Sequence, residues 1–140
     1  MKIIIGSDHA GFKLKKDLIS YLQSLEIEVD DKGTYSLDSV NYPDYAHEVA
    51  KTVLKDKNNL GILICGSANG VCMTANKYKK IRAAIAWQPE IAALAKQHNN
   101  ANILCLPARY ISTMKAKIIL TAYLDADFEG GRHQKRVQLI

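Results

Sequence analysis

Short apolar runs alternate with longer amphipathic segments along all 140 residues of the chain, and this alternation limits the folds open to it. The apolar runs predict five strands, over residues 2–5, 27–29, 60–64, 82–87 and 102–106. The amphipathic segments predict five helices, over residues 11–25, 43–54, 68–78, 88–98 and 112–124. Five β–α units in succession favour a parallel sheet covered by helices on both faces, with right-handed crossovers. We therefore expect one α/β domain over residues 1–140, a three-layer sandwich with a five-stranded parallel sheet. Its last part, residues 125–140, is a basic tail that we expect to contribute to the site.

The composition argues against several classes of protein. Hydrophobic residues make up 48% of the chain and charged residues 24%, which is ordinary for a globular protein. No apolar run approaches the roughly 20 residues that cross a bilayer, and the first residues lack the apolar stretch of a signal peptide. The three cysteines have unlike spacings, and no His-x-x-x-His, Glu-x-x-His or Cys-x-x-Cys pattern occurs. We expect a cytoplasmic protein with reduced thiols, no metal and no contact with a membrane.

The net charge of +5 raises the question of a nucleic-acid partner. Most lysines are scattered among acidic and apolar residues, and no aromatic residues are interleaved with a basic patch. The one compact basic cluster is the segment Gly130-Gly-Arg-His-Gln-Lys-Arg136. Such a cluster suits a small phosphorylated molecule as well as it suits a polymer. We expect a small phosphorylated ligand and no nucleic acid.

Ligands of parallel α/β sheets bind beyond the carboxyl ends of the strands, and the segment Cys65-Gly-Ser-Ala-Asn-Gly70 falls at such an end. A cysteine stands there where an apolar run ends and a loop with two glycines opens into a helix. The free N–H groups and the positive end of the helix dipole stabilise a thiolate and can hold a developing oxyanion. The pattern indicates a reaction site at Cys65. The alternative is a buried core cysteine followed by an ordinary strand–helix turn.

Other candidate residues each have a structural alternative. The glycine-bounded loop after the first strand offers Asp8 and His9 as an acceptor and a titratable donor, unless Ser7 or Asp8 merely caps the helix. His98, near the end of a helix, is either functional or a charge partner of the helix dipole. Arg109 is either a ligand clamp or a surface arginine.

Arg132 and Arg136 are four residues apart, so a helical turn places both guanidinium groups on one face. Two guanidinium groups that converge on one point bind a phosphate dianion well. The alternative is a frayed basic tail.

Taken together, seven segments of the chain resemble the type B ribose-5-phosphate isomerases, a family that includes the galactose-6-phosphate isomerase subunits. The segments are Gly6-Ser-Asp-His-Ala-Gly11, Tyr42-Pro-Asp-Tyr-Ala46, Cys65-Gly-Ser-Ala-Asn-Gly70, Ala75-Asn-Lys77, His98-Asn-Asn-Ala-Asn102, Arg109 and Gly130-Gly-Arg-His-Gln-Lys-Arg136. They span the chain from end to end in the family's order and spacing. The resemblance implies a Rossmann-like sandwich and a homodimer, or a dimer of dimers, with sites between two subunits.

The resemblance also implies roles for individual residues. Cys65 matches the catalytic base, which moves a proton between C2 and C1 of the opened sugar through an enediolate. His98 matches the proton donor that helps to open the furanose ring, with Asp8 nearby to handle ring or hydroxyl hydrogens. The enediolate oxygen would be held by the backbone amides of Gly66, Ser67, Ala68, Asn69 and Gly70. The contacts to sugar hydroxyls and phosphate match His9, Asn99, Arg109, Arg132 and Arg136.

The implied reaction converts ribose 5-phosphate to ribulose 5-phosphate, a step of the non-oxidative pentose phosphate pathway. No redox change occurs in it, so we expect neither a nicotinamide nor any other cofactor. Two further interpretations stay open. One is an isomerase of a six-carbon substrate such as allose or galactose 6-phosphate, and the other is a non-catalytic sugar-phosphate sensor on the same fold.

The loop after the cysteine departs from the family's usual Gly-Thr-Gly, because Ser67 and Ala68 follow Gly66 here. Ser67 keeps a hydroxyl, whereas Ala68 adds a methyl group. We expect the amides to point inward if residue 68 has a negative φ. Val71 stands where one branch of the family has a glutamate base, which leaves Cys65 as the candidate base.

Overall fold

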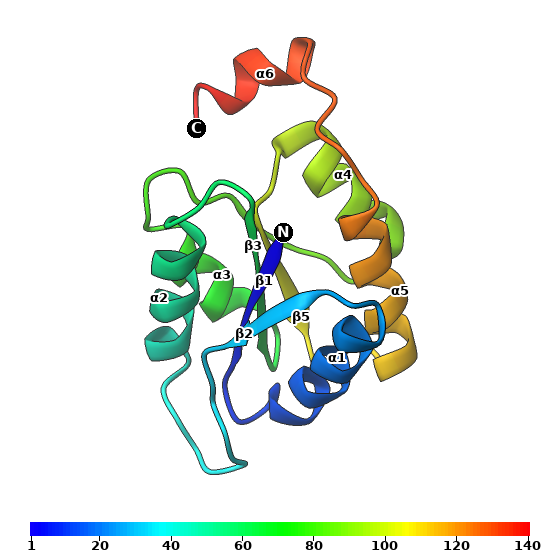
Figure 1. Cartoon of the computed structure of the whole chain (residues 1–140). Coiled ribbons are helices and arrows are strands. Elements are labelled where there is room, and N and C mark those ends of the chain that lie inside the picture. Colours follow the sequence, from blue (N-terminus) through cyan, green and yellow to red (C-terminus); the bar gives the residue numbers. More distant parts are fainter.

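The computed structural model describes residues 1–140 and confirms the expected three-layer α/β sandwich (Figure 1). The strands are β1 (Lys2–Ser7), β2 (Glu28–Asp31), β3 (Asn59–Cys65), β4 (Ala83–Ile85) and β5 (Ile103–Pro107). The helices are α1 (Phe12–Ser24), α2 (Tyr42–Val53), α3 (Asn69–Ala75), α4 (Pro89–Asn99), α5 (Thr113–Leu124) and α6 (Arg132–Val137). Every expected strand and helix is present. β4 and α3 are shorter than expected, and β2 extends into residues that the sequence indicated as loop.

All five strands are parallel, in the order β2-β1-β3-β5-β4. β2 lies on one side of β1, and the chain then crosses over to place β3 on the other side of β1. The direction in which strands are added therefore reverses between β1 and β3. Such a reversal is where ligands bind in open α/β sheets. β1 and β3 end there side by side, with Ser7 opposite Ile64.

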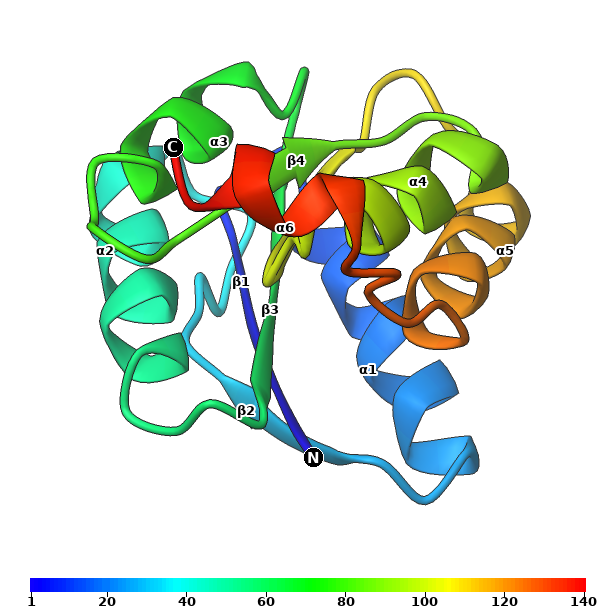
Figure 2. The ribbon, with the colours of Figure 1, turned by 90° about the horizontal axis from the view of Figure 1, so that it is seen from above.

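The two faces of the sheet bury different side chains, because alternate residues of a strand point to opposite sides. Ile3, Ile5 and Ile64 pack with α1, α4 and α5, whereas Ile4 and Leu63 pack with α2 and α3. Figure 2 shows these two helix layers on either side of the strands. Since both faces are covered, the central strands are continuous apolar runs.

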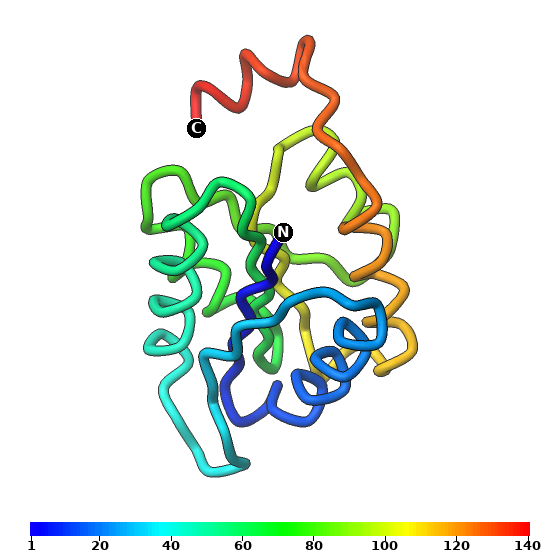
Figure 3. Tube along the Cα trace, viewed as in Figure 1, coloured from blue at the N-terminus to red at the C-terminus, as the bar shows by residue number.

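The segment after α5 leads the chain to α6, at the edge of the sheet where the strands begin. Figure 3 traces this path past the end of α4, with the tail in red. A backbone hydrogen bond from Glu129 N–H to the Gln97 carbonyl, 3.0 Å long, ties the tail to α4. The tail therefore lies on the opposite edge of the sheet from Cys65. None of the helices combines the length and the apolar character that a membrane crossing needs.

Candidate functional site

Cys65 is the last residue of β3, and its side chain is almost enclosed, with the residue 5% exposed. We call this end of the strands the carboxyl edge. The loop that follows reaches α3 within a few residues, and the Cys72 N–H donates to the Ala68 carbonyl in the first helical turn. The thiol therefore lies at the junction of a buried strand and a helix start, as the sequence predicts.

Ala68 has φ 66° and ψ −10°, so the condition of a negative φ at this residue is not met. This is the left-handed region, which glycine enters freely and alanine enters at a cost of about 1 kcal/mol. The loop must reverse direction between the end of β3 and the start of α3, and residue 68 makes that reversal. The loop thus needs a left-handed residue at position 68, a conformation that a glycine would adopt without strain, and in this chain the residue is an alanine.

Arg109 lies against the Cys65 loop. Its N–H donates to the Gly66 carbonyl (3.1 Å), and the neighbouring Ala108 N–H donates to the Cys65 carbonyl (2.9 Å). A Cβ on Gly66 would be 3.2 Å from Nη1 of Arg109. The loops after β3 and β5 are thus held together, with a guanidinium group beside the amides that follow Cys65.

Asp8 and His9 lie at the same edge, after β1. The Asp8 N–H donates to the Ile64 carbonyl (3.2 Å), and the buried Asp8 carboxylate accepts the Gly11 N–H (3.0 Å). His9 Nδ1 accepts the Val40 N–H at 3.3 Å. Asp8 therefore stabilises the turn before α1, whereas the helix itself begins at Gly11 without a side-chain cap, so neither Ser7 nor Asp8 caps it. Both Asp8 and His9 are fixed next to the end of β3.

Tyr42 belongs to this edge, although only its motif drew attention in the sequence. Its ring lies on Gly70, where an added Cβ would be 2.4 Å from Cζ. Tyr42 is the first residue of α2, so it joins the starts of α2 and α3. The glycine after Asn69 was the available signal, because a glycine in a helix start often marks a close approach.

The largest cavity, about 770 Å³, opens beside the Cys65 loop and not over the thiol. Ser67 and Asn69 line one side of it, and Trp87 and Tyr110 line another. Nearby, the Ser7 hydroxyl is buried without a hydrogen-bond partner. Sequence reasoning gave neither feature, because each depends on how β1, β3, β4 and β5 end next to one another.

The other predicted residues lie where the strands begin, which we call the amino edge. His98 and Asn99 end α4, and the Asn99 carbonyl accepts Nε–H of Arg82, which directly precedes β4 (3.1 Å). Arg132 and Arg136 are exposed on α6, the helical turn that the sequence predicts there. β3 has seven residues, so its two ends are roughly 20 Å apart at about 3.3 Å per residue. One chain thus does not bring these four residues to Cys65.

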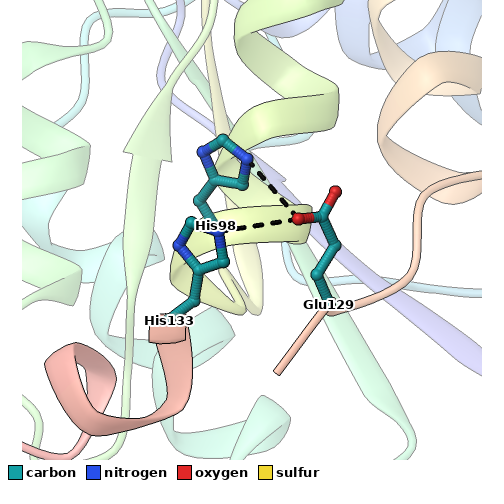
Figure 4. Close-up of side chains that lie close together, drawn as sticks. All are labelled: His98, Glu129 and His133. Carbon is teal, nitrogen blue, oxygen red and sulfur yellow. Dashed lines mark ion pairs between the residues drawn. The ribbon is translucent and has the colours of Figure 1, made fainter. Parts of the chain in front are cut away.

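Three side chains gather at the amino edge that the sequence did not place together (Figure 4). The rings of His98 and His133 are stacked, with centroids 4.1 Å apart and planes 8° apart. Oε2 of Glu129 lies 3.7 Å from Nε2 of His98 and 3.5 Å from Nε2 of His133. Burial, with the positive charges of His98, Arg132 and Arg136 nearby, lowers the pKa of His133, and only Glu129 opposes this.

Two imidazoles and a carboxylate are zinc ligands by type. The rings, however, lie parallel, so their Nε2 lone pairs point side by side and not at a common ion. The arrangement as it stands suits a shared counter-charge better than a metal.

The comparisons with known proteins cover nearly the whole chain. A model of the ribose/galactose isomerase family matches residues 3–140. Ribose-5-phosphate isomerase B of Escherichia coli (strain K12) is 44% identical over 139 residues, 99% of this chain and 93% of that protein. A ribose 5-phosphate isomerase from Thermotoga maritima is 48% identical, with a TM-score of 0.96 over 99% of this chain and 95% of that one. Ribose-5-phosphate isomerase B from Mycoplasma genitalium, solved with bound ribulose-5-phosphate, is 45% identical, with a TM-score of 0.96 over 99% and 92% of the two chains.

Proposed function

The chain belongs to the ribose/galactose isomerase family, and from this premise we propose that it interconverts ribose 5-phosphate and ribulose 5-phosphate. The observation that carries the proposal is Cys65 at the end of β3, with Arg109 across the adjacent Gly66. The similarity to an enzyme solved with bound ribulose-5-phosphate supports a pentose phosphate as substrate.

Cys65 acts as the base in this proposal. Its thiolate takes the proton from C2 of the open-chain aldose, and the electrons of that C–H bond form the C1–C2 double bond of an enediolate. Return of a proton to C1 then gives the ketose. Cys65 ends β3 and α3 begins at Asn69, so the base lies next to the start of that helix.

The enediolate oxygen is bound by the amides between Gly66 and Gly70. A well-placed donor of this kind contributes about 3 kcal/mol, because it meets charge that develops in the transition state. Arg109 adds a positive charge next to the same loop. Asp8 and His9, fixed at the end of β1, lie within the same edge and contact sugar hydroxyls and phosphate.

The remaining groups come from a second subunit. The partner subunit's His98 protonates the ring oxygen as the furanose opens, and the partner's Asn99 binds hydroxyls. The partner's Arg132 and the partner's Arg136 bind the phosphate, so the tail over residues 125–140 serves the neighbouring site. The separation of roughly 20 Å between the two edges supports this arrangement. A two-fold axis that pairs each carboxyl edge with the other chain's amino edge creates two equal sites.

A coupled assay with ribose 5-phosphate tests the proposal, with and without a chelator. Cys65→Ala should lower turnover by about 10³-fold, within the range that a positioned acid–base group contributes. Cys72→Ala is the matched control, because this cysteine lies on the flank of α3 and should leave turnover close to wild type.

Full turnover by Cys65→Ala would contradict the mechanism. The same assay with allose and galactose 6-phosphates tests the six-carbon alternative, which predicts the higher kcat/KM on one of those sugars. Binding of ribose 5-phosphate without any conversion by the wild type would favour the sensor.

A further inference from the structure

The carboxylate of Glu129 is held next to His98 by the backbone. The Glu129 N–H donates to the carbonyl of Gln97, the residue before His98. The side chain then places one oxygen 3.7 Å from His98 Nε2 and 3.5 Å from His133 Nε2. These distances exceed those of direct hydrogen bonds, so the carboxylate acts as a counter-charge to the imidazole pair.

The two rings are not equivalent. The His133 side chain is 9% exposed and that of His98 is 36% exposed. His133 is faced by His98 on α4 and by Arg132 and Arg136 on its own helix. His98 is therefore the ring of the pair that water and a ligand can reach, and it lies 3.7 Å from the carboxylate of Glu129.

Stacking fixes the orientation of that ring. With planes 8° apart and centroids 4.1 Å apart, the neutral ring of His133 presents a flat surface to His98. His133 also belongs to α6, so the same contact holds the helix that carries Arg132 and Arg136 against α4.

We propose that Glu129 and His133 are positioning residues for His98: the carboxylate places a counter-charge beside its Nε2, and the stacked ring fixes its orientation for opening the sugar ring. The inference rests on the proposed function and adds to it the groups that prepare the acid. In the step, the C1–O4 bond breaks, its electrons go to O4, and O4 takes the proton of His98. The C1 hydroxyl loses its proton to solvent as the aldehyde forms, and solvent then reprotonates His98.

The test uses two readouts that differ in whether a ring must open. Ribose 5-phosphate enters as a furanose, whereas ribulose 5-phosphate is open-chain because its C5 oxygen is esterified. Glu129→Gln should lower kcat on ribose 5-phosphate about tenfold, part of the effect of a positioned acid, with little change in KM. Deuterium uptake from D₂O at C1 of ribulose 5-phosphate should stay at the wild-type rate, because it needs only the base.

Glu26→Gln is the matched control, since Glu26 is exposed and forms no ion pair at the cluster, and both readouts should be unchanged. Cys65→Ala should lower both readouts by about 10³-fold. A Glu129→Gln enzyme with wild-type kcat would overturn the inference. So would an equal loss in both readouts with a raised KM, because Glu129 would then only hold α6 in place.

A measurement without substrate separates this inference from the proposed function. The pKa of His133 is lowered overall, and Glu129 is the one group that opposes this lowering. Glu129→Gln should therefore move the ¹⁵N-detected titration of the His133 ring to still lower pH. An unmoved titration would overturn the inference. A wild type that neither converts ribose 5-phosphate nor exchanges deuterium would overturn the proposed function instead.

Discussion

At residue 68 an alanine adopts a backbone conformation that glycine favours. Replacement by glycine removes left-handed strain worth about 1 kcal/mol. It also removes a buried methyl group and raises the conformational entropy of the unfolded chain. Each of these two changes lowers the free energy of unfolding by somewhat less than about 1 kcal/mol. These effects nearly cancel, so Ala68→Gly should change the free energy of unfolding by less than about 0.5 kcal/mol.

Ala75→Gly provides the contrast, because Ala75 is equally buried but lies in the last turn of α3. There the methyl group and the helix propensity are both lost, which costs about 1.5–2 kcal/mol. Urea unfolding of both variants measures the difference. Equal losses would show that residue 68 is not strained.

At the scale of the elements, two glycines govern how loops meet at the carboxyl edge. A Cβ on Gly11 would be 2.7 Å from the backbone carbonyl oxygen of Ile64, which cannot move without distorting β3. Gly11→Ala should therefore lower the free energy of unfolding by about 2–3 kcal/mol, in the range of overpacked cores.

Gly66→Ala meets only the flexible side chain of Arg109, 3.2 Å away. It should cost under about 1 kcal/mol of stability but displace the guanidinium group, and so raise KM for ribose 5-phosphate. Thermal unfolding and steady-state kinetics distinguish the two variants. A more stable Gly11→Ala protein would contradict the close approach of α1 to β3.

The docking of α6 should depend on pH through His133. Its pKa is lowered in the folded protein, so below the ordinary histidine pKa of about 6.5 the unfolded chain binds the proton more tightly. The contribution of this ring to stability is thus level above that pH, falls as pH drops below it, and levels off again below the folded pKa. His133→Gln should flatten the stability profile between neutral and mildly acidic pH, measured as the difference in urea midpoint between variant and wild type. Parallel profiles would contradict the burial of the ring.

At the scale of the whole molecule, a shared site predicts recovery of activity when two inactive proteins are mixed. Cys65→Ala inactivates the part of the site that the carboxyl edge contributes, and His98→Gln inactivates the part that the amino edge of the other chain contributes. A mixed dimer has one site with both defects and one with neither. Equal amounts, reassorted at random, should therefore regain about one quarter of wild-type turnover.

The control is each variant reassorted with itself, which should regain nothing. A mixture that stays inactive, while mass spectrometry shows mixed dimers, would place Cys65 and His98 in the site of one and the same chain.

The sequence by itself determined the strands, the helices and the position of Cys65 at a strand end. Periodicity, helix-favouring prolines and glycines in turns are properties of neighbouring residues, and they need no knowledge of distant segments. The order of the motifs along the chain pointed to the family without the tertiary structure, because each motif is also a run of neighbouring residues. The sequence also indicated that Arg132 and Arg136 share one face of a short helical turn, because they are four residues apart, and both lie on α6.

Only the tertiary structure decided which of these groups meet. The left-handed Ala68, Arg109 on Gly66 and Tyr42 on Gly70 result from contacts between segments far apart in the chain. The same holds for Glu129 between His98 and His133, since a tail residue reaches α4 only after the sheet has formed. The fold also put His98 and Cys65 on opposite edges, because a helix that follows a parallel strand returns to the edge where the strands begin.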